Sequence, residues 1–298
     1  MPDTAVADAE PRLSPAQLAA RYGLGIAGER PSLTAYSQKL WSYRHFISAY
    51  ANAKLIASLG TARLGRIWQV LTPLINAAIY YLIFGVIVGT DRGMSNFIAY
   101  LCAGLFVFSF TQTVVQSGTQ SITGNLGLIR ALHFPRACLP IAVTLTQFQN
   151  LISSIVVLMV IVLVTGEPLT LEWLLLAPAL VLQSAFSAGL AMAMARLGSK
   201  MPDLKQVMPF VLRTWMYGSG VLYSVDLFTE HLPHGLALVV QANPMLVYIE
   251  LVRHALLEGA PLSWSPTWLW VLGITWALVA ALGGYVYFWR GEREYGRG

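Results

Sequence analysis

The sequence is short of charge: Asp, Glu, Lys and Arg make up 11% of its 298 residues, whereas hydrophobic residues make up 56%. This balance is unusual for a soluble domain and typical of a polytopic membrane protein. Cysteine is also scarce, because Cys102 and Cys138 are the only two and their spacing suits neither a metal site nor a redox pair. Residues 1–30 lack the basic start and the apolar centre of a signal peptide. Residues 1–35 are therefore predicted to form a flexible cytoplasmic tail.

Several motifs of catalysis and energy conversion are missing. The sequence has no Gly-Lys-Ser/Thr loop for nucleotide phosphates and no Asp-x-Asp pair, and His231 and His234 have no third metal ligand beside them. We therefore expect a chain that is not itself an enzyme and that holds no metal or cofactor. None of the long uncharged runs contains Asp or Glu, which disfavours an ion-coupled transporter, since such proteins bury an acid in a span.

The chain has instead a series of uncharged runs long enough to cross a bilayer, which takes about 20 apolar residues. Five long runs cover residues 67–90, 93–129, 137–166, 173–195 and 261–289, and a shorter sixth covers 214–225. The connectors alternate between basic and acidic, and the basic ones are expected in the cytoplasm. The sequence thus predicts an all-α integral membrane fold in which residues 67–298 form six transmembrane helices with both termini cytoplasmic. The net charge of +5 lies on the cytoplasmic connectors and indicates contact with membrane lipids, not with nucleic acid.

Residues 36–66 are predicted to lie at the cytoplasmic surface of the membrane. Apolar side chains recur there at helical spacing beside Lys39 and Arg44, as in a basic amphipathic helix of the headgroup plane. The recurring residues are Leu40, Tyr43, Ile47 and Tyr50. A helix that packs on another protein surface is the alternative interpretation.

A second region, residues 235–249, is uncharged but too short for a full crossing. Asn243-Pro244 interrupts it, as expected for a turn between two short helices. We predict a re-entrant or interfacial helix pair between spans five and six. A re-entrant pair would form part of the wall of a pathway, because a broken helix at membrane depth has to be sheltered by protein, whereas an interfacial pair would only pack.

The connector between the second and third runs, residues 125–140, reads NLGLIRALHFPRACLP. Its apolar residues alternate with Arg130, His133 and Arg136, and Pro135 cannot continue a helix. This pattern predicts a short amphipathic helix at the cytoplasmic face. A compact element of this kind suits docking into a groove on a partner protein.

Four segments carry a family resemblance: GRIWQVLTPLINAAIYYLIFG (residues 65–85), NLGLIRALHFPRACLP (125–140), KMPDLKQVMPFVLRTWMYGSGVLYS (200–224) and NPMLVYIELVRHALLEG (243–259). With them, the chain from about Tyr43 to its C-terminus resembles the membrane permeases of ABC exporters that move lipid-linked polysaccharides. That family includes O-antigen, teichoic acid and mycobacterial-type galactan exporters. The chain departs from it upstream, where many members have an Arg-Asp-Leu-Lys run followed by Tyr, because ANAKLIASLG at residues 51–60 keeps only Lys54.

The resemblance implies a homodimer of permeases that works with two copies of an ABC ATPase subunit, and ATP and Mg would bind to that partner. In the family, the position of residues 125–140 holds the coupling helix that inserts into the ATPase. The residues that would contact the ATPase by this resemblance are Leu128, Ile129, Arg130, Phe134, Pro135 and Arg136.

The expected function is export of a polyprenyl-linked polysaccharide, O-antigen-like or a cell-wall galactan, across the bacterial cytoplasmic membrane. Aromatic faces stack on sugar rings, and Arg side chains bind pyrophosphate. The aromatic candidates for the passage are Tyr80, Tyr81, Phe106, Phe108, Phe110, Trp215 and Tyr217; the candidates for a pyrophosphate or lipid headgroup are Arg63, Arg66 and Arg213. Two alternatives stay open: an ion-coupled flippase for lipid-linked glycans, and an ABC exporter of another lipid or of a drug.

Overall fold

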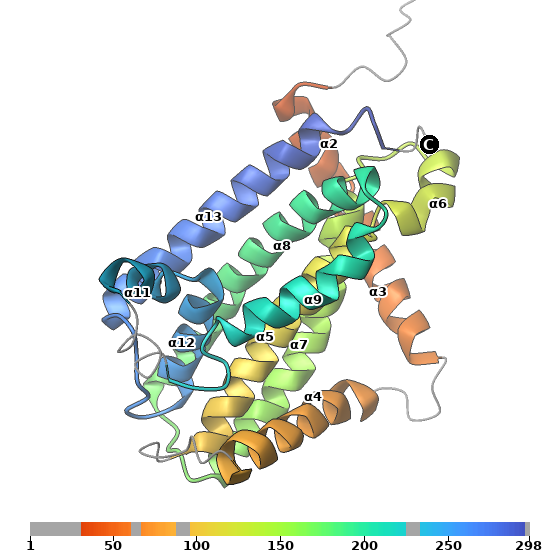
Figure 1. The fold of residues 1–298 in the computed structure, drawn as a ribbon. Helices are drawn as coiled ribbons and strands as arrows, with labels where there is room; N and C mark the ends of the chain where they lie inside the picture. Colours follow the sequence, from red (N-terminus) through yellow and green to blue (C-terminus); the bar gives the residue numbers. More distant parts are fainter. Residues whose placement is uncertain (1–30, 61–66, 88–95, 225–232, 296–298) are drawn as a thin grey trace, which may run out of the picture.

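A computed structural model describes residues 31–60, 67–87, 96–224 and 233–295 of the chain, and every regular element in these ranges is helical (Figure 1). Four long helices form the body of the bundle. They are α5 (Phe97–Thr119), α7 (Cys138–Val164), α8 (Leu176–Lys200), which continues the 3-10 turn η3 (Leu171–Leu175), and α13 (Pro266–Arg290). Each is long and apolar enough to cross a membrane. The structure thus confirms an all-helical fold with four such helices, or five if α11 and α12 (below) count as one bent span.

Glycines let the long helices approach each other closely. A Cβ atom on Gly284 of α13 would lie 2.0 Å from the backbone oxygen of Gly189 in α8. On the opposite face of α8, nine residues further on, a Cβ on Gly198 would lie 2.0 Å from the backbone oxygen of Thr119 at the end of α5. Small residues at such contacts are typical of helix packing in membranes, where close backbone approach provides van der Waals contact. Helix α8 is therefore held between α13 and α5.

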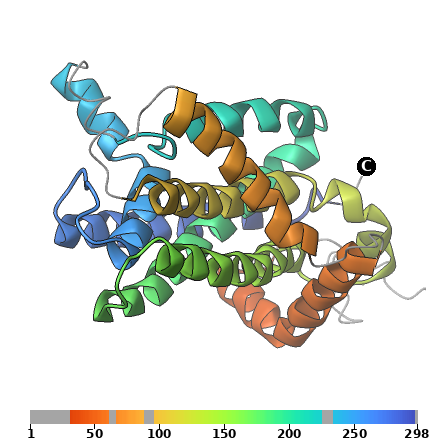
Figure 2. The same cartoon turned by 90° about the horizontal axis from the view of Figure 1, so that it is seen from below.

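Three shorter helical elements, α4, η1 and α9, pack against the outside of this bundle. Helix α4 (Ile67–Tyr80) continues into the π-helix η1 (Tyr81–Ile87), and α9 (Leu204–Tyr217) follows α8. Seen from below, α4 runs obliquely over α5 (Figure 2). Many of the large apolar side chains of these three elements are exposed: Ile75, Ile79, Leu82, Val86, Ile87, Val207, Phe210 and Val211. This apolar face has no partner within the described part of the chain.

The predicted broken helix pair is present. Helices α11 (His234–Gln241) and α12 (Pro244–Leu256) meet at an angle of 59° around Asn243. The Asn243 side chain caps α12 by accepting from the Met245 N–H at 3.1 Å. It also accepts from the Trp215 indole N–H at 3.0 Å and donates to the Gly218 oxygen at 2.8 Å. One side chain therefore fixes both the break and the end of α9.

Helix α12 lies inside the bundle, and two of its charged residues are buried. Glu250 and Arg253 belong by sequence to the connector between the last two predicted spans, and in the structure both side chains are enclosed by the fold. The Arg253 guanidinium is fully buried and donates to the oxygens of Tyr100, Gly220 and Val221 at 2.9–3.2 Å. The Glu250 carboxylate accepts from the backbone and side chain of Ser263. Local hydrogen bonds thus offset the cost of burying both charges.

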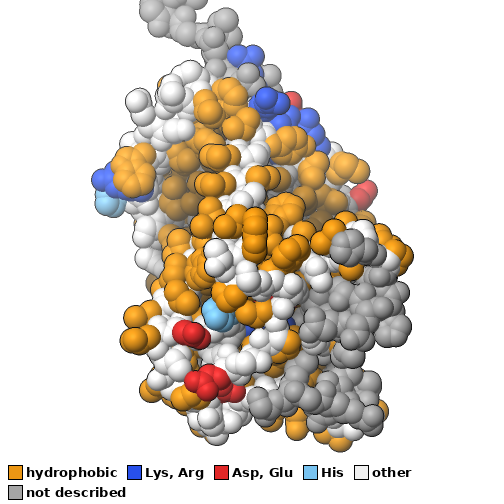
Figure 3. All heavy atoms as spheres, turned by 90° about the vertical axis from the view of Figure 1, so that its left-hand side faces the viewer, with side chains coloured by type: hydrophobic (Ala, Val, Ile, Leu, Met, Phe, Trp, Pro, Cys, Tyr) orange, Lys and Arg blue, Asp and Glu red, His pale blue; other side chains and the backbone are white. Residues whose placement is uncertain are grey.

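Large hydrophobic side chains also cover the middle of the face on which α13 and α11 lie (Figure 3). At one end of the bundle, helices α2 (Leu33–Ser42) and α3 (Arg44–Gly60) form the expected helical region near the N-terminus. The Trp289 indole donates to the Pro31 oxygen at 3.0 Å, so the two ends of the described chain lie together. An even number of crossings between these ends agrees with this arrangement. Residues 1–30 of the predicted tail and the candidates Arg63 and Arg66 lie outside the described residues. The tail was predicted to reach residue 35, but α2 begins at Leu33, where the Ser32 side chain caps it.

Candidate partner-docking site

The connector between α5 and α7 forms a short projecting element at the same end as the two chain ends (Figure 1). It consists of the 3-10 turn η2 (Thr123–Asn125) and α6 (Leu126–Ala131), followed by extended backbone at Leu132. The helix ends four residues before Pro135, so Pro135 follows the helix and does not end it directly. The predicted short helix is confirmed, and we call residues 123–136 the docking segment.

Three of the six residues predicted to contact an ATPase are buried within this chain. Ile129 is 6% exposed, Phe134 is 5% exposed, and Pro135 is also buried. The Phe134 ring lies 5.2 Å from that of Phe46 in α3, between ring centroids. These side chains form part of a core cluster that joins α2, α3, α6, α7 and the C-terminal end of α13. Their place in the structure is to hold the docking segment against the bundle.

The exposed surface of the docking segment is formed by other side chains. Arg130 is exposed, as predicted, and Leu128 is half-buried. Leu132, which is 50% exposed, and His133 also face outward, although the sequence reasoning did not select them. The sequence offered a signal for both, because they lie between Ile129 and Phe134, two large apolar residues of the kind that faces inward. The outer surface thus combines one Arg, one His and one large apolar side chain.

Hydrogen bonds from Tyr43, at the end of α2, and from Tyr50 of α3 fix both ends of α6. The Tyr50 hydroxyl donates to the Asn125 side-chain oxygen at 2.6 Å, just before the helix. The Tyr43 hydroxyl donates to the His133 backbone oxygen at 3.2 Å, just after it. The two tyrosines predicted to lie at the membrane surface therefore also position the docking segment.

A buried carboxylate ties the docking segment to both ends of the chain. Glu292, 5% exposed, accepts from the Tyr36 hydroxyl at 2.8 Å, and its other oxygen accepts from the Arg136 backbone N–H at 3.0 Å and from its guanidinium at 3.3 Å. The Tyr36 oxygen accepts in turn from the Ala137 N–H at 3.2 Å. Burial raises the pKa of Glu292, while its three donors act in the opposite direction. Burial and the nearby Glu292 likewise raise the pKa of Tyr36.

Sequence reasoning selected Arg136 but missed Tyr36 and Glu292. Tyr36 and Glu292 are 256 positions apart, so no local pattern joins them. Tyr36 begins the region predicted to lie at the membrane surface, and the sequence analysis made no prediction for Glu292. Only the closure of the bundle brings the two side chains to Arg136.

The aromatic passage candidates fall into two groups. Phe106, Phe108 and Phe110 of α5 are buried in the main core, so other helices of the same chain enclose them in this conformation. The remaining candidates, Tyr80, Tyr81, Trp215 and Tyr217, lie on α4, η1 and α9, and Tyr81 and Tyr217 are exposed.

Arg213 joins the second group. The Tyr80 side chain of α4 lies near enough to Tyr217 and Arg213 of α9 to interact electrostatically with both. The structure therefore brings together two of the predicted aromatic residues and one predicted arginine. Within the described residues no group of three His, Cys, Asp or Glu side chains could hold a metal ion.

The sequence matches a known family over most of its length. Residues 46–257 match the family described as ABC-2 type transporter. The chain is 24% identical over 209 residues to the O-antigen export system permease protein RfbA of Myxococcus xanthus, which covers 70% of this chain and 79% of that protein. It is also 24% identical to the protein of the same name from Klebsiella pneumoniae, over 70% of this chain and 78% of that one.

A third relative transports a different glycan. The polysialic acid transport protein KpsM of Escherichia coli is 24% identical over 67% of this chain and 76% of its own length. The resemblance to polysaccharide-exporter permeases is thus confirmed by relatives named for two kinds of polysaccharide. Taken with the four long apolar helices, the match shows that the chain belongs to the ABC-2 type transporter family and is a multi-pass membrane permease.

Proposed function

We propose that this chain is the membrane subunit of an ATP-driven exporter that moves a lipid-linked polysaccharide across the bacterial cytoplasmic membrane. The observation that carries the proposal is the docking segment: a short projecting helix whose inner side is packed and whose outer side presents Arg130, Leu132 and His133. A rigid element with an exposed apolar and basic surface is suited to insertion into a groove of a partner. ATP and Mg would bind to that partner, a separate ATPase subunit.

The proposed assembly is a homodimer with two ATPase subunits. The exposed apolar face of α4, η1 and α9 supports a second copy of the chain as its partner, since two such faces would cover each other. The assembly has six spans per chain: the four long helices, a fifth formed by α4 together with η1, and a sixth formed by α9. In this count α11 and α12 form a re-entrant pair and not a span. The common position of the two described chain ends supports this count and cytoplasmic termini.

The passage for the glycan would run along α4 and α9. Tyr80, Tyr217 and Arg213 lie together there, and they combine aromatic faces for sugar rings with a guanidinium for a phosphate. The names of the relatives support a polysaccharide as the cargo. The buried Glu250 gives little support to an ion-coupled mechanism, because Ser263 already engages both of its oxygens.

The proposal is tested by purifying the chain together with a candidate ATPase from the same genome and measuring ATP hydrolysis. Arg130→Glu and Leu132→Asp change only exposed side chains, so we expect folded permease that no longer retains the ATPase. Lys205→Glu provides the matched control, since Lys205 is an exposed base in the first turn of α9 and we expect normal co-purification.

Phe134→Ala is unsuitable for this purpose, because it would open a cavity under the docking segment. If the wild-type chain is folded but retains no ATPase, the ATP-driven function fails. If both docking-segment variants still bind and activate the ATPase normally, the segment is not the docking site.

A further inference from the structure

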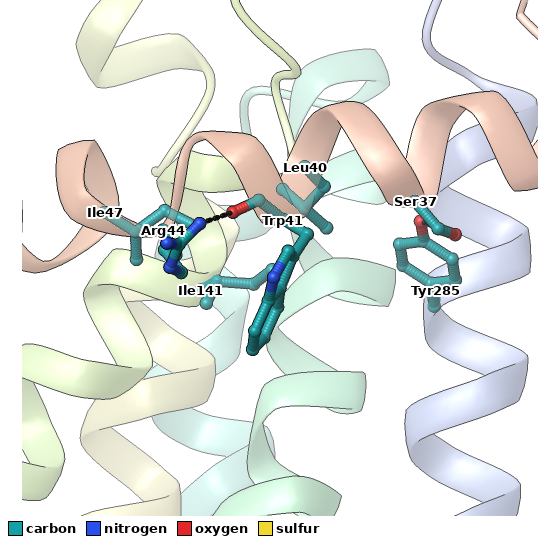
Figure 4. Close-up of a pocket in the computed structure, with 7 residues that line it drawn as sticks. All are labelled: Ser37, Leu40, Trp41, Arg44, Ile47, Ile141 and Tyr285. Carbon is teal, nitrogen blue, oxygen red and sulfur yellow. Dashed lines mark hydrogen bonds between the residues drawn. The ribbon is translucent and has the colours of Figure 1, made fainter.

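A cavity lies beneath the interface helix α2, on the opposite side of that helix from the solvent. Its volume is about 440 Å³, within the range of small-molecule sites. Figure 4 shows α2 running across the ends of the long helices, with the cavity between it and α7 and α13. It is lined by Ser37, Leu40, Trp41, Arg44, Ile47, Ile141 and Tyr285.

The floor and wall of this cavity are apolar. Leu40, Ile47 and Ile141 contribute aliphatic side chains from α2, α3 and α7. Trp41 is 71% exposed although it is one of the largest apolar side chains in the protein. Its ring points away from α2 along the direction of the long helices (Figure 4). In a membrane protein such a ring lies at the level where headgroups meet acyl chains.

Polar groups lie at the two ends of the cavity. At one end the Arg44 guanidinium lies 5.5 Å from the centre of the Trp41 ring and donates to the Trp41 backbone oxygen at 3.3 Å. At the other end the hydroxyls of Ser37 and Tyr285 are 2.8 Å apart. The cavity thus has a cation at one end, hydroxyls at the other and apolar side chains between them.

The charged side chains of α2 and α3, which line one side of the cavity, all have one sign. The sequence of α2 and α3 contains Lys39, Arg44 and Lys54 but no Asp or Glu. Basic residues at the cytoplasmic surface are attracted to anionic lipids, by about 1 kcal/mol for each Lys or Arg. The apolar lining suits an acyl chain, and the cation suits a phosphate.

From this combination we propose that the cavity binds one anionic glycerophospholipid of the inner leaflet, with its phosphate at Arg44 and an acyl chain along Trp41 and Ile141. The site is separate from the passage proposed above, because it lies on α2, α7 and α13, whereas Arg213 and Tyr217 lie on α9. The occupant is a structural lipid of the bilayer and not the exported cargo.

Binding there would also have a consequence for the docking segment. Ser37 lines the cavity, and its neighbour Tyr36 donates to Glu292, which holds Arg136. A lipid that fixes α2 against α7 and α13 therefore stabilises the same helix that positions the docking segment. The binding itself can be tested without any ATPase, so its outcome is independent of the proposed transport function.

The test uses the purified full-length chain in nanodiscs of phosphatidylcholine that contain increasing amounts of a brominated lipid, which quenches tryptophan fluorescence on contact. The chain has nine tryptophans, so the signal of Trp41 is taken as the difference between wild type and Trp41→Phe. We expect brominated phosphatidylglycerol to reach half-quenching of Trp41 at about one fifth of the mole fraction that brominated phosphatidylcholine needs, as one basic contact provides. Equal quenching by the two lipids would overturn the proposal.

Three variants separate a site from general surface attraction. Arg44→Gln should abolish the preference for phosphatidylglycerol, and Lys205→Gln, an exposed base away from the cavity, should keep it. Ile141→Phe should also abolish the preference, because it fills the cavity while Arg44 stays in place. If Lys205→Gln loses the preference, or if Ile141→Phe keeps it, the cavity is not the binding site.

A competition experiment identifies the occupant. Unbrominated phosphatidylglycerol and a polyprenyl phosphate are each added at the same mole fraction to nanodiscs that contain brominated phosphatidylglycerol. We expect phosphatidylglycerol to relieve the quenching of Trp41 and the polyprenyl phosphate to relieve it less. Stronger relief by the polyprenyl phosphate would overturn the proposal and make the cavity a site for cargo-type lipid.

Discussion

Replacement of Glu292 by Leu should weaken the folded protein more than its position near the C-terminus suggests. The carboxylate accepts from the Tyr36 hydroxyl and from the backbone and side chain of Arg136. Leucine accepts from none of them. Two buried donors, the Tyr36 hydroxyl and the Arg136 N–H, would lose their acceptor at about 1–3 kcal/mol each. Part of this loss is offset because a buried carboxylate is removed, which leaves a net cost of about 2 kcal/mol.

The measurement is the thermal unfolding midpoint of the detergent-purified chain. A loss of about 2 kcal/mol corresponds to a decrease of roughly 4–8 °C for a domain of this size. Glu294→Leu is the matched control, because Glu294 is two residues away and forms an exposed ion pair with Lys200 at 2.9 Å. We expect a much smaller shift for this variant, since exposed pairs contribute little. Equal shifts for the two variants would refute the reasoning.

A double-mutant cycle assigns the effect to the proposed contacts. Tyr36→Phe removes the hydroxyl that donates to Glu292, so Glu292→Leu should cost less in that background than in the wild type. Strict additivity of the two substitutions would show that the hydrogen bond between them contributes nothing measurable.

The pH dependence of stability gives an independent measurement on Glu292. Burial raises its pKa in the folded state, so the folded protein holds the proton more tightly than the unfolded chain. Stability should therefore decrease as the pH rises from about 4.3, the usual Glu value, through the raised pKa, and this contribution should level off above it. Glu292→Gln should remove this part of the slope. A wild-type stability that instead increases relative to Glu292→Gln over this range would contradict the direction of the shift.

Two further substitutions test the packing of the bundle. Gly284→Leu should prevent the close approach of α13 to Gly189 of α8 and abolish a monodisperse peak in size-exclusion chromatography. Gly283→Leu should be tolerated, because an added Cβ there meets nothing within 4 Å. Equal behaviour of the two variants would contradict the packing argument. Arg253→Met should destabilise the chain by about 3–5 kcal/mol in thermal unfolding, because it leaves buried carbonyls and a buried carboxylate without their cation. Arg290→Met at the exposed end of α13 should have little effect, and a similar loss there would show that Arg253 has no special role.

The long helices could be predicted because their signal is local. A run without charge that exceeds 20 residues has few alternatives: α5 and α7 lie within the predicted runs, and α8 and α13 extend past theirs by five residues and by one residue. The break at Asn243-Pro244 was readable for the same reason, since proline lacks the N–H that a continuous helix needs. The burial of Arg253 could not be predicted from the sequence. Its acceptors are backbone oxygens of α5 and of the turn after α9, and backbone oxygens leave no trace in the sequence.

The fourteen residues of the docking segment also combine features that the local sequence predicts with features that only the fold determines. Its helical pattern is local and was predicted correctly, and the contact of its basic side chains with an ATPase stays a prediction. Which side chains face outward depends on what covers the segment. Phe134 is buried because Phe46 lies beside it, and Ile129 because it belongs to the same cluster. A family resemblance gives the position of an element but not the direction of each side chain, so Leu132 and His133 became visible only in the fold.

The docking segment is held by α2 and α3, which also line the proposed lipid site, and this restricts how the segment can move. Tyr43 and Tyr50 bind its two ends, and Tyr36 binds it through Glu292. A partner that pushes on α6 would therefore displace α2 and α3 together with it, or break at least three hydrogen bonds. Trp41 of α2 is 71% exposed and points away from that helix, so the first outcome would change the contact between α2 and a lipid in the proposed site. Partner docking and lipid contact are thus mechanically linked through one pair of helices, whatever cargo passes through the bundle.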